Sequence, residues 1–141
     1  PNHRPAFSSE DSALWAEVKK LIEAEGTRPP RLLEIAEAVD MDARPLGQFM
    51  QRAVRIGLLA RVADNRYFLP STLLVLGELA EGLAENSADE EFTAGEFNKK
   101  SALGRNLAIQ LLEYFDKAGL TRRVDNKRRI VKPAAQVFGS A

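Results

Sequence analysis

A short stretch of this 141-residue chain occurs twice, about sixty residues apart. Residues 56–66 read IGLLARVADNR, and residues 118–127 read AGLTRRVDNK. In both copies a glycine follows a helical pattern, and a short run containing Leu and Val then leads to an Asp-Asn turn. Such self-similarity indicates a repeated structural unit. We therefore expect two small domains, residues 1–70 and 71–141, separated only by Pro70 and Ser71.

The first domain is predicted to contain three helices and a hairpin. Ser8 is a good N-cap for the first helix, which ends near Gly26, and apolar spacing predicts a short second helix over 32–39. Pro45 suits the first turn of a third helix, which ends at Gly57. Residues 58–62 and 66–69 then form a hairpin around the Asp64-Asn65 turn.

The second domain repeats this order. We expect a helix over 72–85, a loop over the acidic run 86–91, and a short helix that begins at Thr93 and is followed by a polar turn at 98–100. The longest helix is expected over 103–117, and a hairpin over 120–124 and 127–131. Three helices and a hairpin make a winged helix. The predicted fold is therefore mostly α with small β-hairpins, an α+β class with two winged helices in tandem.

Composition excludes several functions. The chain is 45% hydrophobic and has no cysteine and one histidine, His3. It therefore lacks disulfides and thiolate metal ligands, and no constellation of catalytic or metal-binding side chains is visible. We therefore expect that these 141 residues have no enzyme activity and bind no metal or cofactor. It has no apolar run that could cross a membrane and no leader pattern, so the cytoplasm is the expected location.

Charge is divided unevenly along a chain whose formal net charge is zero. Residues 1–91 carry ten Lys/Arg and sixteen Asp/Glu, whereas residues 92–141 carry ten Lys/Arg and four Asp/Glu. This asymmetry suggests a polyanionic partner for the second domain. The alternative is that the two halves attract each other.

The basic residues of the second domain fall where a winged helix can reach one groove. Some lie around the start of the long helix, where free N–H groups favour an anion. The others lie on the adjoining hairpin. Long basic side chains also keep exposed strands soluble, so a purely structural role remains the alternative. The candidate nucleic-acid-binding residues are Lys99, Lys100, Ser101, Gly104, Arg105, Arg122, Arg123, Lys127, Arg128 and Arg129.

Arg122 stands out when the two repeats are compared. The matching residue of the first domain is Ala60, so the second domain has placed an arginine between Leu120 and Val124. A guanidinium there needs a partner. That partner could be a carboxylate such as Glu113, or a phosphate or base edge of a nucleic acid.

Residues 92–98 (FTAGEFN) and 104–124 (GRNLAIQLLEYFDKAGLTRRV) resemble the last winged helix of bacterial selenocysteine-specific elongation factors. The specific elements are the Gly-Arg, the Leu-Glu-Tyr-Phe-Asp and the Thr-Arg-Arg. The resemblance implies that this end of the protein holds an mRNA stem-loop that marks a UGA codon for selenocysteine. It also implies a longer monomeric factor that binds GTP, magnesium, selenocysteyl-tRNA and the ribosome through other domains. The acidic first domain would then be a spacer that joins the RNA-binding end to those domains. RNA recognition commonly targets unpaired loop or bulge bases, which agrees with this reading.

Two other functions fit the pattern. A tandem winged-helix transcription regulator would read a DNA major groove with the third-helix face that carries Gln48, Gln51, Arg52 and Arg55. The acidic character of the first domain and the lack of a dimerisation helix argue against it. A protein-interaction adaptor would use winged helices as rigid blocks.

Overall fold

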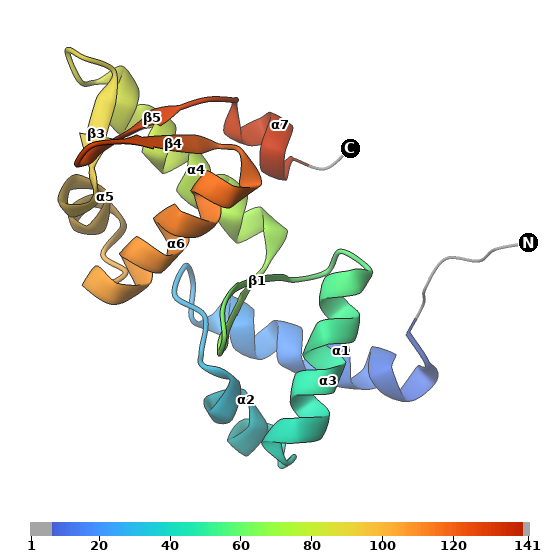
Figure 1. Cartoon of the computed structure of the whole chain (residues 1–141). Helices are drawn as coiled ribbons and strands as arrows, with labels where there is room; N and C mark the ends of the chain where they lie inside the picture. The colour runs from blue at the N-terminus through green and yellow to red at the C-terminus, as the bar shows by residue number, and fades with distance from the viewer. Residues whose placement is uncertain (1–6, 140–141) are drawn as a thin grey trace, which may run out of the picture. The chain divides into compact units, whose positions relative to one another are not determined.

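The computed structural model describes residues 7–139. The chain divides into two compact units, Pro1–Pro70 and Ser71–Ala141, which we call unit 1 and unit 2. Each unit combines helices with one small antiparallel sheet (Figure 1). The predicted α+β fold with a winged helix in each half is confirmed.

The described part of unit 1 forms three helices and a two-stranded hairpin in the predicted order. The first helix begins where Ser8 Oγ accepts the backbone N–H of Asp11 at 3.0 Å, which satisfies one donor that the first turn cannot pair internally. The elements are α1 (Ser9–Ala24), α2 (Leu32–Ala38), α3 (Ala43–Arg55), β1 (Ala60–Ala63) and β2 (Arg66–Phe68).

The third helix supplies the centre of the unit 1 core. Its inward side chains at positions 46, 49, 50 and 53 are fully buried, as the apolar spacing predicts. Val18 and Ile22 of α1 and Ile35 of α2 complete the packing. The hairpin closes the unit, since Tyr67 and Phe68 of β2 are also buried.

Four helices and three strands form the described part of unit 2. The strand order is β3-β5-β4, and all neighbours are antiparallel. We call the β4–β5 hairpin the wing. The elements are α4 (Pro70–Glu85), β3 (Glu91–Thr93), α5 (Ala94–Ser101), α6 (Arg105–Ala118), β4 (Thr121–Val124), β5 (Lys127–Ile130) and α7 (Ala134–Phe138).

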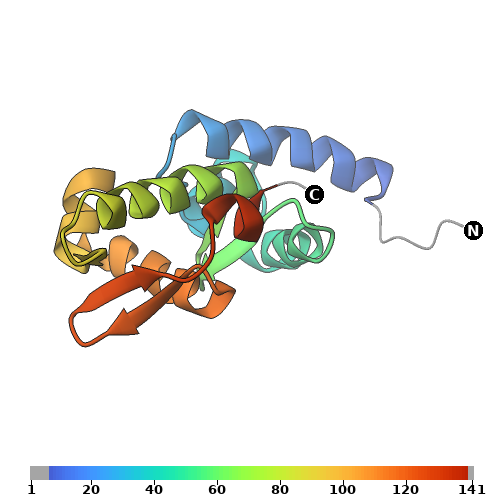
Figure 2. The same cartoon turned by 90° about the horizontal axis from the view of Figure 1, so that it is seen from above.

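The wing and α6 are arranged around one buried core. Phe97 of α5 and Phe115 of α6 are fully buried and meet edge to face, with ring centroids 6.2 Å apart. Strand β4 runs back in the direction opposite to α6. The turn of the wing and the start of α6 therefore both lie at the left of unit 2 in either view (Figures 1 and 2).

Several boundaries in unit 2 differ from the prediction. Pro70 and Ser71 are not a linker but the first residues of α4, where proline is tolerated because the first helical N–H has no partner. Glu91 was expected in a loop but lies in strand β3, which pairs with β5. A three-residue strand is too short to show a period, and its pairing partner is distant in sequence, so the sequence gives no sign of it.

The two helices of the predicted binding region also differ in detail. Residues 98–100 form the last turns of α5 rather than a separate turn. Gly104, at φ +96°, is the N-cap of α6, which therefore starts two residues later than expected and is shorter than α1 and α4. A further helix, α7, lies in the tail from Lys132, for which the sequence made no prediction.

Candidate nucleic-acid interface

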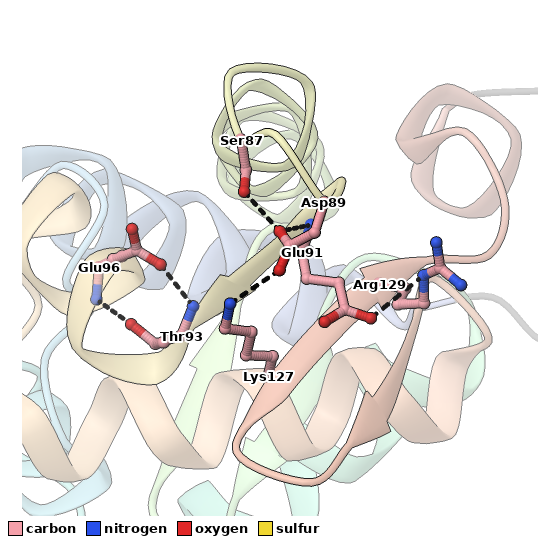
Figure 3. Close-up of polar contacts among 7 residues, drawn as sticks. All are labelled: Ser87, Asp89, Glu91, Thr93, Glu96, Lys127 and Arg129. Atoms are coloured by element: carbon pink, nitrogen blue, oxygen red, sulfur yellow. Dashed lines mark hydrogen bonds and ion pairs between the residues drawn. The ribbon is translucent and has the colours of Figure 1, made fainter.

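Hydrogen bonds from side chains fix both ends of α5 and thereby define the α5–α6 junction. Thr93 Oγ1 accepts the N–H of Glu96 at 3.0 Å, and Glu96 returns a carboxylate oxygen to the N–H of Thr93 at 2.8 Å (Figure 3). This reciprocal capping box fixes the start of α5. At the other end, Asn98 Oδ1 accepts the N–H of Gly104 at 3.0 Å, which ties the turn to α5.

The start of α6 is open to an anion. Its N-cap is Gly104, which has no side chain with which to pair the N–H groups of the first turn. The first residue of the helix, Arg105, is exposed, and so are Lys99 and Lys100 in the last turn of α5. These three side chains form no hydrogen bond or ion pair within residues 7–139. The junction therefore combines free amides with free cations.

Ser101 contributes less than expected to this junction. Its hydroxyl is half-buried and lies 3.5 Å from the backbone oxygen of Asn98, within its own helix. Gly104 has no side chain and can contribute only its backbone groups. Its positive φ is a conformation that other residues rarely adopt.

The wing divides its predicted cations between the two faces of the sheet. In the β4–β5 register, Arg123 faces Arg128 across the strands, and Arg122 faces Arg129. Directly opposite residues share a face, and successive residues alternate. The pair 123/128 therefore lies on one face and the pair 122/129 on the other.

Arg128 is turned inward and is held by a carboxylate. Its Nε lies 3.2 Å from both oxygens of Asp116 on α6, and a terminal nitrogen lies 3.0 Å from one of them. Only 7% of the Arg128 side chain is exposed. The guanidinium is thus occupied by the protein, and this placement argues against a phosphate contact at Arg128.

Lys127 and Arg129 are also paired, although both are exposed or half-buried. The ammonium group of Lys127 lies 2.8 Å from Asp89 Oδ2, and Arg129 Nε lies 3.4 Å from Glu91 Oε2 (Figure 3). Their partners belong to the acidic stretch that the sequence suggested was only a loop. Much of the wing's formal charge is therefore neutralised within unit 2.

Arg123 remains exposed on the same face as Arg128, the face that contacts α6. Its Nε donates to the backbone oxygen of Asp125 at 3.0 Å, which draws the side chain toward the wing turn. The terminal nitrogens of the guanidinium are left for a ligand. Arg123 thus joins the junction cations as the wing residue best placed beside α6.

Arg122, which the sequence singled out, lies in different surroundings. It lines a cleft of about 400 Å³ together with Glu81 and Glu85 of α4 and Glu90. No ion pair with Glu113 or any other described residue is formed. The arginine is therefore unpaired, but three carboxylates line the cleft beside it, and they make this side of the wing less favourable for a polyanion.

The structure also reveals residues that sequence reasoning missed. Asp89, Asp116 and Glu91 hold the three cations of β5, and none was named as a contact. A triplet of basic residues in one strand gives a partial signal, because alternation must turn the middle one toward the opposite face. The choice of partner depends on the fold.

The rival DNA-reading face in unit 1 is partly occupied. Arg52 donates from Nε to one oxygen of Asp11 at 2.8 Å and from a terminal nitrogen to the other at 3.0 Å. This two-point contact raises the pKa of Arg52, mainly through the hydrogen bond to Asp11. The guanidinium is committed to α1 rather than presented to a groove.

Residues 7–139 contain neither a candidate metal-ligand cluster nor a helix that could span a membrane. No group of three or more His, Cys, Asp and Glu side chains in this range could hold a metal ion. No helix in the same range has the length and apolar character needed to cross a membrane. His3 lies outside the described residues.

This chain is similar to known proteins in sequence and to a solved structure in fold. A family model described as the winged helix of elongation factor SelB matches residues 86–130. The selenocysteine-specific elongation factors of Haemophilus influenzae and Escherichia coli are 30% and 28% identical over 126 residues. The resemblance to the selenocysteine-specific elongation factors is confirmed. Each match covers 89% of this chain but only 20% of the relative, so the chain spans about a fifth of their length.

A solved structure similar to this chain is the mRNA-binding domain of SelB from E. coli, in complex with SECIS RNA. It is 26% identical, has a TM-score of 0.80, and matches 89% of this chain and 100% of its own. The matched part of the chain is longer than either unit alone, so the likeness to SelB extends beyond the 45 residues of the family model.

Proposed function

We propose that this chain is the mRNA-binding part of a selenocysteine-specific elongation factor and that unit 2 binds an mRNA stem-loop. The observation that carries the proposal is the likeness to the SelB domain solved with SECIS RNA. The free cations of unit 2 support it, because phosphate groups supply the main attraction between proteins and nucleic acids.

The contacts are assigned to the junction and to one side of the wing. Lys99, Lys100 and Arg105 would bind phosphates together with the free amides at the start of α6. Arg123 would bind the backbone from the wing. We assign a smaller part to Arg122, because its surroundings are acidic. Lys127 and Arg129 would contribute only by exchanging their carboxylate partners for phosphate.

A stem-loop suits this arrangement better than a regular duplex. The deep, narrow major groove of A-form RNA excludes side chains, so sequence-specific proteins bind unpaired bases in loops or bulges. A helix start and a wing can contact the backbone at two places and accept an unpaired base between them. A duplex offers the same phosphates but no such base.

The remaining functions of the parent protein are proposed from its relatives. A factor of this kind would bind GTP with magnesium, selenocysteyl-tRNA and the ribosome through other domains, and would act in the cytoplasm as a monomer. The 141-residue chain would itself need no cofactor and carry out no catalysis. Unit 1, which is acidic, would serve as a spacer between the RNA-binding tip and those domains.

A three-substrate titration tests the proposal. The 141-residue chain is titrated at one salt concentration with a labelled stem-loop from a selenoprotein message, a loopless RNA duplex and a DNA duplex. We expect the stem-loop to bind more than tenfold more tightly, a difference of at least about 1.4 kcal/mol. Deleting the unpaired bases should remove most of this preference and leave salt-sensitive binding. Equal affinity for all three would refute the proposal.

A further inference from the structure

Asp116 connects α6 to both strands of the wing. It lies near the end of α6, and one of its oxygens accepts the hydroxyl of Thr121 on β4 at 2.6 Å. Arg128 on β5 donates to the same carboxylate from two nitrogens, at 3.0–3.2 Å. We call these three residues the Asp116 network.

The Asp116 network fixes the relative orientation of its side chains as well as the distance between them. A guanidinium that donates from two nitrogens to one carboxylate holds both groups in a common plane, which a single ammonium contact cannot do. The hydroxyl of Thr121 then occupies a further lone pair of the carboxylate. The Arg128 side chain is 7% exposed and that of Asp116 is 27% exposed, so the guanidinium is shielded from water and the carboxylate is partly shielded.

Stability alone is a weak reason to keep such a group. The desolvation of a buried ion pair offsets much of its attraction, and replacement by apolar side chains of similar volume is often neutral for folding. A positioning role is therefore distinguishable from a stabilising one, because apolar replacement would preserve the fold but lose the directional bonds.

The Asp116 network joins the two elements that carry the proposed RNA contacts, α6 and the wing. Arg105 stands at the start of α6, about 16 Å along the helix axis from Asp116 at a rise of about 1.5 Å per residue. Arg123 pairs with Arg128 across the wing, so it follows any movement of that residue. The distance between these two proposed RNA-binding cations therefore depends in part on the contacts of the Asp116 carboxylate.

The geometry points to Asp116 as a positioning residue that, through Arg128 and Thr121, holds the wing at the separation from α6 that a stem-loop requires. This inference rests on the proposed function of unit 2. Arg128 then contributes to RNA binding without touching RNA.

The decisive variant replaces the ion pair by apolar residues in the 141-residue chain, Asp116→Leu with Arg128→Met. We expect thermal unfolding close to that of the wild type, but a loss of at least fivefold in the preference for the stem-loop over the loopless RNA duplex. Binding to the duplex should be retained. In the free protein, NMR order parameters of the β4–β5 amides should fall, because the directional bonds are gone. The control removes the Arg52–Asp11 ion pair of unit 1 through Asp11→Asn with Arg52→Gln, and it should leave the preference unchanged.

Two milder variants decide the matter if the apolar pair does not fold. Arg128→Lys keeps the charge but not the two-nitrogen contact, and Thr121→Val removes only the hydroxyl. Both should lower the stem-loop preference while the duplex affinity stays within twofold. Unchanged preference in every folded variant would overturn the inference and leave the proposed function intact. A wild type without preference for the stem-loop would refute the proposed function, and the inference with it.

Discussion

The ammonium group of Lys127 on β5 lies 2.8 Å from a carboxylate oxygen of Asp89, in the segment that leads from α4 to β3. Asp89 also accepts the hydroxyl of Ser87 at 2.6 Å and the N–H of Glu91 at 3.1 Å. The acidic segment is thus bonded to the wing and to the start of β3 at one carboxylate. These contacts lower the pKa of Asp89, with the hydrogen bond from Lys127 as the largest cause.

This pair gives a prediction about pH. We expect NMR titration to place the Asp89 pKa well below its ordinary value of about 3.9, and Lys127→Met to raise it again. Because the folded-state pKa is the lower one, the stabilising contribution of Asp89 is present above about pH 4 and is lost as the pH falls through the folded value. The pKa of Lys127 is raised, mainly by the hydrogen bond to Asp89, so its contribution is lost only above about pH 10.

Denaturant unfolding checks the same pair. The stability difference between the wild type and Lys127→Met should be present at neutral pH and vanish in strong acid. Lys132→Met, at an exposed position two residues beyond β5, is the matched control and should show no such pH dependence. A normal Asp89 pKa in the wild type would contradict the prediction.

A second prediction concerns the buried face of α6. Leu111→Ala should lower the free energy of unfolding by about 2–5 kcal/mol, because Leu111 is fully buried and the change leaves a cavity. Ile109→Ala on the exposed side of the same helix should cost about 0.5 kcal/mol or less. Calorimetry or urea unfolding measures both, and similar losses for the two variants would contradict the packing described.

The contact between α4 and α7 supplies a third prediction. A Cβ at Gly77 would lie 3.0 Å from Ala134 Cβ and 3.3 Å from a methyl group of Leu120. Gly77→Ala should therefore destabilise unit 2 by about 1–3 kcal/mol through overpacking. Gly82→Ala in the same helix meets nothing within 4 Å and should instead stabilise by up to about 1 kcal/mol. Shifts of opposite sign in the thermal unfolding temperatures of the two variants would confirm that α7 packs on α4.

A fourth prediction separates the proposed RNA contacts from the other cations. Alanine at Lys100, Arg105 or Arg123 should weaken stem-loop binding and lower the salt slope by somewhat under one unit per variant. Arg55→Ala in unit 1 is the control and should change neither quantity. Filter binding at several salt concentrations measures both. A larger effect at Arg55 than at Arg123 would move the binding face to unit 1.

The fold could be predicted from local signals. Ser8 and Thr93 cap helices, Gly57 and Gly119 end them, and the Asp64-Asn65 and Asp125-Asn126 turns close the hairpins, all within a few residues in sequence. Strand β3 and helix α7 gave no such signal. Each has five residues or fewer and owes its structure to partners more than thirty residues away, as the bond from Ala134 N–H to Glu81 illustrates.

The location of the candidate site could be predicted, but the pairing of its cations could not. The gathering of cations around the start of α6 and on the following hairpin can be read from the amino-acid order, because charge and helix boundaries are local properties. Which of these cations are free depends on how the elements pack. Packing aims Arg128 at Asp116 and Arg129 at Glu91, whereas Arg105 and Arg123 remain exposed. The physical reason is that an ion pair needs contact within about 4 Å, and contacts between residues distant in sequence are made only when the elements pack.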